Sequence, residues 1–142
     1  MSPTALERDF EHDGITIHAL EQGTGPVVLL IHGYPETSHS WRHQVPALAA
    51  AGYRAVAIDV RGYGRSSRPE AVEEYSMGRL VADNVRIAEA LGADEVVAVG
   101  HDWGAPIAWT SALLRPDLFS ALAMLSVPYT PPSVRKPTTV FA

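Results

Sequence analysis

Short apolar runs alternate with longer segments of helical periodicity along this chain. Residues Val27 to Ile31 form a continuous apolar run that is too short for a helix and rich in β-branched side chains, which predicts a strand buried on both faces. Similar runs at Arg54 to Val60, Glu95 to Val99 and Phe119 to Val127 predict three more buried strands. Alternation over Ile15 to Leu20 indicates an antiparallel strand before them.

Three helices are predicted between these strands. Trp41 to Ala51 is rich in alanine and is followed by Gly52, as a helix with a glycine cap would be. The apolar positions of Met77 to Leu91 recur at near-helical spacing, and Gly104 to Leu114 forms the third helix. Strands that alternate with helices predict an α/β fold, a three-layer α/β/α sandwich with a mostly parallel sheet and right-handed crossovers.

The pattern changes after the last strand. Residues Pro128 to Pro137 contain four prolines in ten positions, which is typical of an extended linker. We therefore divide the chain into residues 1–127, a globular core, and residues 128–142, the start of a linker.

Composition and charge argue against several classes of partner. The chain has 142 residues, of which 46% are hydrophobic, enough for the core of one soluble domain. A net charge of −5 disfavours nucleic acids and acidic membranes as partners. No cysteine, no apolar leader and no apolar run of membrane-spanning length occur. We expect a cytoplasmic protein without a membrane partner.

Candidate chemistry lies where the third buried strand meets the next helix, at Gly100-His101-Asp102-Trp103-Gly104. This is a glycine-x-nucleophile-x-glycine pattern, in which small residues flank a side chain on a sharp, strained turn. Such a turn lifts Asp102 above the carboxyl edge of the sheet, where the amides of the helix start also point. The alternative is that Asp102 only caps the helix, since aspartate is a favoured capping residue.

A second motif, His32-Gly33-Tyr34-Pro35, follows the first buried strand and therefore lies on the same edge of the sheet. In folds with a nucleophile elbow, this loop and the residue after the nucleophile supply the two amides of an oxyanion hole. The candidate oxyanion donors are thus the backbone amides of Tyr34 and Trp103, with Asp102 as the candidate nucleophile.

These motifs, together with Ser40-Trp41-Arg42-His43-Gln44 and Asp59-Val60-Arg61-Gly62-Tyr63-Gly64-Arg65-Ser66-Ser67, resemble soluble epoxide hydrolases of the α/β-hydrolase superfamily. The resemblance runs from about Ile15 to Tyr129 and implies the N-terminal half of an α/β-hydrolase fold. It also implies that Asp102 opens an epoxide to an alkyl-enzyme ester, which water then hydrolyses to a vicinal diol without a cofactor. Haloalkane dehalogenases share the His-Asp-Trp-Gly elbow but usually have a polar residue at position 34, so the aromatic Tyr34 favours the epoxide reaction.

Other polar residues receive structural interpretations. We expect His101 to pack beside the elbow and His32 to orient its loop. His12, His18, His39 and His43 show no spacing with carboxylates that indicates a metal site, so no metal is predicted. The loop around Gly62-Tyr63-Gly64 is interpreted as a turn, and the Glu73-Glu74 pair as a solvated face.

The family resemblance also implies parts that have no match in this chain: a helical cap with tyrosines that protonate the epoxide oxygen, and the acid and histidine of the charge relay. An apolar sheet edge at Phe119 to Val127 is expected to lie uncovered. Three alternatives follow: a shortened gene product, one piece of a split protein whose second chain supplies the histidine, or an inactive interaction module on a hydrolase scaffold. A homo-oligomer is a further possibility.

Overall fold

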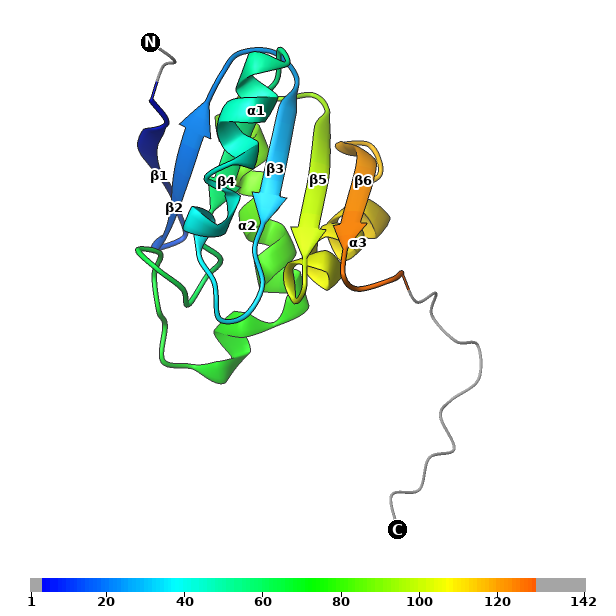
Figure 1. The fold of residues 1–142 in the computed structure, drawn as a ribbon. Helices are drawn as coiled ribbons and strands as arrows, with labels where there is room; N and C mark the ends of the chain where they lie inside the picture. The colour runs from blue at the N-terminus through cyan, green and yellow to red at the C-terminus, as the bar shows by residue number, and fades with distance from the viewer. Residues whose placement is uncertain (1–3, 130–142) are drawn as a thin grey trace.

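The structure is a computed structural model, and it describes residues 4–129. Its centre is a six-stranded sheet with the order β1-β2-β4-β3-β5-β6 (Figure 1). The strands are β1 Leu6–His12, β2 Ile15–Gln22, β3 Val27–Ile31, β4 Arg54–Ile58, β5 Val96–His101 and β6 Phe119–Leu125. The pairs β1–β2 and β2–β4 are antiparallel, and all the other pairs are parallel. The mostly parallel sheet predicted from the sequence is confirmed.

Helices cover both faces of the sheet. Helix α1, Gln44–Ala50, packs on β2 and β4 on one face, while α2, Met77–Ala90, and α3, Gly104–Leu114, lie together on the other (Figure 1). Two short 3₁₀ helices, η1 at Ser38–Trp41 and η2 at Val72–Tyr75, precede α1 and α2. The molecule therefore has the three layers that the sequence predicts.

Strand β3 shows why a continuous apolar run was needed. Val27, Leu29 and Ile31 belong to the core cluster that includes α2 and α3 residues, whereas Val28 and Leu30 belong to the cluster that includes Val45 of α1. Successive side chains of a strand point to opposite faces, so a strand between two helical layers buries every residue.

The hairpin of β1 and β2 extends the sheet beyond the expected strands. The sequence pattern does not predict β1, because only Leu6 and Phe10 among its seven residues are large and apolar. Asp13 and Gly14 join the two strands with φ angles of +48° and +76°. An Asp-Gly pair with two positive φ angles is the preferred two-residue hairpin turn, so this dipeptide was an available signal for β1.

Several element ends differ from the prediction. The helix expected from Trp41 is a 3₁₀ turn at Ser38–Trp41 followed by a shorter α1 that begins at Gln44. Strand β4 ends at Ile58, and β6 ends at Leu125 rather than Val127. Most of the linker predicted for residues 128–142 lies outside the described residues.

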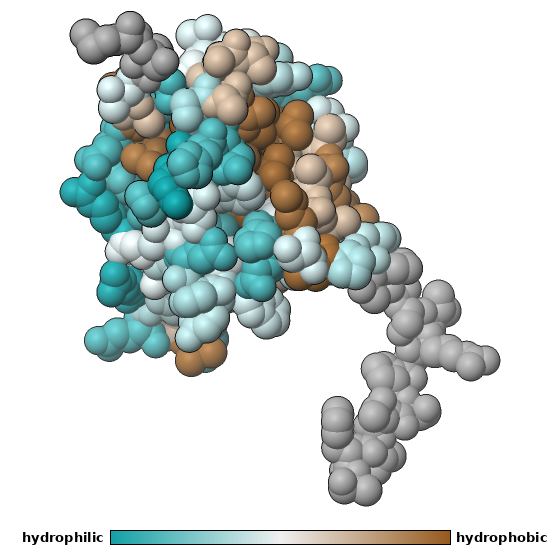
Figure 2. All heavy atoms as spheres, in the orientation of Figure 1, coloured by the Kyte–Doolittle hydropathy of each residue, from teal (hydrophilic) through white to brown (hydrophobic). Residues whose placement is uncertain are grey.

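Strand β6 forms one edge of the described sheet, as expected. Hydrophobic side chains gather over the β5 and β6 side of the molecule in Figure 2, and Leu122 and Leu125 are 37% and 44% exposed. None of the helices within residues 4–129 is both long enough and apolar enough to cross a bilayer.

Candidate active site

Asp102 occupies a tight turn between β5 and α3. Its φ angle is +56°, in the left-handed region that non-glycine residues rarely adopt. The flanking glycines are required by contact: a Cβ at Gly100 would lie 2.3 Å from the carbonyl oxygen of Gly104, and one at Gly104 would lie 2.1 Å from that of Ile31. Backbone strain of this kind costs about 1–3 kcal/mol and is concentrated at functional sites. The turn thus has the geometry of a nucleophile elbow.

Two backbone amides converge on the Asp102 carboxylate. The amide of Tyr34 donates to Oδ2 at 3.1 Å, and the amide of Trp103 also donates to the carboxylate. The hydrogen bond from Trp103 and then that from Tyr34 lower the pKa of Asp102 from its ordinary value. Among the described residues, no ion pair includes Asp102. Its negative charge is therefore held by neutral donors rather than cancelled by a cation.

Gly33 allows the two loops to approach this closely. A Cβ at Gly33 would lie 2.4 Å from Cβ of Asp102 and 2.5 Å from its Oδ2. Any side chain at position 33 would thus displace the carboxylate or the loop that carries Tyr34. The structure brings together all three residues of the predicted site, and their catalytic role stays a prediction.

The capping alternative is not what the structure shows. The N-cap residue of α3 is Trp103, and its side chain makes no capping hydrogen bond. The main-chain carbonyl of Asp102 accepts from the amide of Ala105 at 3.1 Å at the start of α3. The Asp102 side chain faces the loop after β3 instead.

His32 holds the loop after β3 in place through hydrogen bonds, as the sequence predicts. Its Nδ1 lies 2.8 Å from the carbonyl of Gly33, and its Nε2 accepts from the amide of Val60 at 2.9 Å. Because Nε2 accepts, Nδ1 carries the proton and donates to Gly33, so the ring is neutral. Burial lowers the pKa of His32, which favours this neutral form.

Asp59, which the sequence analysis did not single out, ties the loop after β3 to the loop after β4. Its Oδ1 accepts from the amide of Ser38 at 2.7 Å, and its Oδ2 accepts from that of Arg65 at 2.9 Å. Burial raises the pKa of Asp59, but the hydrogen bonds from Arg65 and Ser38 outweigh this effect, so the pKa is lowered. Its place at the carboxyl end of a parallel strand was the available signal.

None of the histidines within residues 4–129 is hydrogen-bonded to Asp102. The ring of His101 lies 3.5 Å from Glu36, as a residue beside the elbow rather than a base on the carboxylate. His12 lies 2.7 Å from Asp83, and His18 lies 2.7 Å from Asp9. No cluster of metal-ligating side chains occurs in the described part of the chain.

The expectation for the Glu73-Glu74 pair is wrong for its second member. Glu73 is exposed, but Glu74 is partly buried and accepts from Nη1 of Arg61 at 3.0 Å. Arg61 in turn holds both carboxylate oxygens of Asp83, at 2.7 and 2.9 Å. These residues are distant in sequence, so no local spacing could indicate the network.

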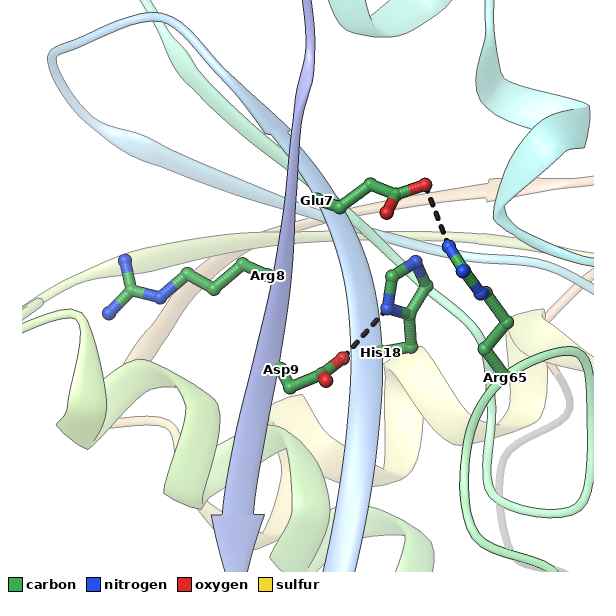
Figure 3. A pocket seen from close by; sticks show the side chains of 5 residues that line it. All are labelled: Glu7, Arg8, Asp9, His18 and Arg65. Carbon is green, nitrogen blue, oxygen red and sulfur yellow. Dashed lines mark hydrogen bonds and ion pairs between the residues drawn. The ribbon is translucent and has the colours of Figure 1, made fainter.

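A polar pocket of about 380 Å³, which we call the hairpin pocket, lies beside the β1–β2 hairpin (Figure 3). It is lined by Glu7, Arg8, Asp9, His18 and Arg65. Glu7 pairs with Arg65 and Asp9 pairs with His18, both at 2.7 Å. The side chain of Arg8 points away from these pairs in Figure 3 and binds Glu21 at 3.0 Å. The acids of this pocket are thus paired with bases, unlike Asp102.

The chain belongs to the α/β hydrolase fold family, whose sequence profile matches residues 26–139. Among curated relatives, it is 50% identical over 137 residues to "Epoxide hydrolase A" of Mycobacterium tuberculosis. It is 44% identical over 131 residues to "Bifunctional epoxide hydrolase 2" of Sus scrofa. These matches cover 95% and 91% of this chain but only 42% and 24% of the relatives, so the chain spans less than half of their length.

Solved structures give the same result for the fold. "Epoxide hydrolase from an endophytic Streptomyces" superposes with a TM-score of 0.87 at 61% identity, over 89% of this chain and 38% of that chain. "Crystal structure of Epoxide Hydrolase A from Mycobacterium thermoresistibile" superposes with a TM-score of 0.89 at 48% identity, over 95% and 43% of the two chains. The resemblance inferred from the sequence motifs is confirmed.

Proposed function

We propose that this chain carries the nucleophile of an epoxide hydrolase, and that the nucleophile is Asp102. The observation that supports the proposal best is the convergence of the Tyr34 and Trp103 amides on a carboxylate at the elbow. The relatives and solved structures named above are called epoxide hydrolases, and these names support the choice of substrate. The substrate would be a small epoxide, with water as the second reactant.

The first step uses the charge of Asp102. A carboxylate oxygen forms a bond to one ring carbon as the bond between that carbon and the ring oxygen breaks, and the ring oxygen takes a proton from an acid or from water. An ionised carboxylate is a competent nucleophile for this displacement at saturated carbon. The lowered pKa of Asp102 keeps the group ionised at neutral pH.

The second step would use the two amides again. Water adds to the carboxyl carbon of the ester and loses a proton, the ester bond breaks to release the diol, and Asp102 returns to a carboxylate. The carbonyl oxygen becomes negatively charged on the way, and donors about 2.7–3.1 Å from that position stabilise it. None of the histidines within residues 4–129 is hydrogen-bonded to the Asp102 carboxylate, so the water-activating histidine of the proposed enzyme would come from elsewhere. No step requires a metal or a cofactor.

Intact-mass analysis tests this proposal on the 142-residue chain. Incubation with methyloxirane at neutral pH is expected to add the mass of one epoxide per chain, and peptide mapping is expected to place it on Asp102. Asp102→Asn removes the charge but keeps the shape, so it is the matched control and is expected to stay unmodified.

Three results would contradict the proposal: an adduct on another residue, an equal adduct in Asp102→Asn, or no adduct on the wild-type chain. Reaction with a bromoalkane but not with the epoxide would instead favour the dehalogenase alternative. Sustained diol formation by a verified 142-residue species would show that one of its six histidines acts as the base.

A further inference from the structure

Arg61 is a buried cation that the proposed reaction does not use. It lies in the loop after β4, and its side chain is only 2% exposed. Its Nε and Nη2 donate to the two carboxylate oxygens of Asp83 in α2, at 2.9 and 2.7 Å. Its Nη1 donates to the main-chain carbonyl and to the carboxylate of Glu74 in η2, at 2.9 and 3.0 Å. One guanidinium therefore fastens the loop after β4 to two other segments.

A gain in stability does not explain why these charges are buried. The side chain of Asp83 is 3% exposed, so both members of the pair lose nearly all of their hydration. This loss offsets most of their attraction, and apolar side chains of similar volume in place of a buried ion pair often fold as well or better. A bidentate pair does provide a fixed geometry, because the planar guanidinium and the carboxylate fit in one orientation. The contact is therefore suited to holding the loop in one position.

The loop that Arg61 holds is in contact with the candidate site. Val60, the residue before Arg61, donates its amide to Nε2 of His32 at 2.9 Å. Tyr63 donates its amide to the carbonyl of Val60 at 2.8 Å. The Tyr63 ring also meets the His32 ring edge to face, with centroids 5.1 Å apart and an interplanar angle of 74°. The position of the His32 ring thus depends on the loop after β4.

A single peptide unit connects His32 to Asp102. Nδ1 of His32 donates to the carbonyl of Gly33 at 2.8 Å, and the amide of Tyr34 donates to Oδ2 of Asp102 at 3.1 Å. The carbonyl of Gly33 and the amide of Tyr34 belong to the same planar peptide bond, so a rotation that moves one also moves the other. A shift of the His32 ring would therefore turn the amide that binds the candidate nucleophile.

Glu74 fixes the loop after β4 from a second direction. The residue after Glu74 is Tyr75, whose ring lies so close to Gly62 that a Cβ there would be 2.8 Å away. The hydroxyl of Tyr75 donates to the carbonyl of Pro69 at 2.6 Å, so the ring that contacts the loop is itself held. The hydrogen bonds from Arg61 to Glu74 thus keep the Tyr75 ring against the residue that follows Arg61.

We infer that Arg61 is a positioning residue for the candidate active site: it fixes the loop after β4, and this loop aims the Tyr34 amide at Asp102. The inference rests on the proposed function, because the reaction that it would affect takes place at Asp102. Arg61 itself is not catalytic, since its guanidinium contacts Asp83 and Glu74 rather than the elbow. It controls the direction of one candidate oxyanion donor.

A paired apolar replacement separates positioning from folding. Arg61→Met with Asp83→Leu, the apolar variant, removes both buried charges and replaces them with side chains of similar size. Glu74 keeps a basic neighbour in this variant, because Nη2 of Arg79 lies 3.6 Å from its carboxylate. The midpoint of urea unfolding is therefore expected to stay near that of the wild-type chain.

NMR of the 142-residue chain reads the position of the donor without any epoxide. In the apolar variant, the amide proton of Tyr34 is expected to move upfield as its hydrogen bond to Asp102 lengthens, and the titration midpoint of Asp102 is expected to rise. The rate of methyloxirane adduct formation is expected to fall about tenfold or more. The matched control is Arg86→Met with Glu89→Leu, which removes an exposed ion pair from α2 and is expected to leave all three measurements unchanged.

Arg61→Lys keeps the test valid if the apolar variant does not fold. Lysine retains the charge, but it lacks the rigid fork that donates to both oxygens of Asp83 and to Glu74. The Tyr34 amide is expected to move in the same direction as in the apolar variant, because charge alone does not restore the position of the loop.

Two results would overturn the inference. The first is a Tyr34 amide signal and an adduct rate that stay at their wild-type values in the folded variants, which would leave Arg61 a structural residue only. The second is slower adduct formation with an unchanged Tyr34 amide, which would exclude the route through this donor. Absence of any adduct on the wild-type chain would contradict the proposed function alone, and the Tyr34 signal would still decide the role of Arg61.

Discussion

The carboxylate of Asp102 and the carboxylates of Glu7 and Asp9 have different surroundings. In the hairpin pocket, Glu7 faces Arg65 and Asp9 faces His18, so each negative charge has a basic partner (Figure 3). At the elbow, two main-chain amides bind Asp102, and no ion pair with a described residue neutralises it.

The comparison shows that a group of charged residues is a poor indicator of chemistry. The hairpin pocket has more titratable side chains than the elbow, yet both of its carboxylates are paired with basic side chains. An exposed ion pair such as Glu7–Arg65 contributes about 0–1 kcal/mol to stability. A reactive carboxylate needs donors that hold it in place without removing its charge, and preorganised amides do this.

The largest effect is expected from Gly33→Ala, which disrupts the contact between the loop after β3 and Asp102 at the elbow. The new Cβ would overlap Asp102 at 2.4 Å, so the amide of Tyr34 and the carboxylate cannot keep their positions. Loss of one such donor or a displacement of about 1 Å lowers a rate by about 10²-fold, and we expect that loss in the rate of epoxide adduct formation.

The control for this prediction is Gly78→Ala in α2. No heavy atom lies within 4 Å of the Cβ it would add, and its φ is not positive. It should leave the adduct rate unchanged and raise the free energy of unfolding by about 0.5–1 kcal/mol. An adduct rate in Gly33→Ala equal to that of Gly78→Ala would show that the close approach is not needed.

A smaller effect is expected from Asp59→Asn, which tests whether the elbow depends on the loops behind it. The change removes the charge that accepts from Ser38 and Arg65, and hydrogen bonds to a charged group contribute about 1.5–3 kcal/mol. We expect a loss of about this size in the free energy of unfolding, measured by urea denaturation at pH 7.

The pH dependence of this loss gives a second check. The pKa of Asp59 is lowered in the folded state, so its stabilisation is present above the unfolded pKa and disappears as the pH falls through the folded pKa. The difference between wild type and Asp59→Asn should therefore shrink below about pH 4. A constant difference down to pH 2 would contradict the role given to the carboxylate.

The smallest effect is expected in the hairpin pocket. Arg65→Ala removes an ion pair whose side chains are 65% and 62% exposed, so the free energy of unfolding should fall by less than about 1 kcal/mol. The adduct rate at Asp102 should stay within about twofold of wild type. A large loss of adduct formation would mean that the hairpin pocket takes part in the chemistry and that the comparison is mistaken.

Much of the fold was predictable because burial leaves a simple pattern. Strand β3 is apolar at every position since helices lie on both sides of it, and α3 begins and ends as predicted. Strand β1 is an edge strand whose exposed residues are mostly charged, so its pattern is weak and only the Asp13-Gly14 turn marks it.

The elbow was predictable for a similar reason. Gly100, Gly104 and Gly33 are required by contacts that repeat wherever this turn is built, so their spacing marks the site. A cavity of about 300 Å³ next to the elbow was not predictable, because Tyr63, Tyr75 and Ile107, which help to line it, come from separate segments and only the fold brings them together. The cytoplasmic location, the second chain and the homo-oligomer stay predictions.

The most direct test of the central claim is a carboxyl titration of Asp102 by NMR, followed together with the amide signals of Tyr34 and Trp103. The account predicts a pKa for Asp102 below its ordinary value of about 3.9 and amide shifts that follow the same midpoint, since both amides donate to the charged form. A midpoint at or above the ordinary value, or amide signals that do not change as Asp102 titrates, would contradict the account.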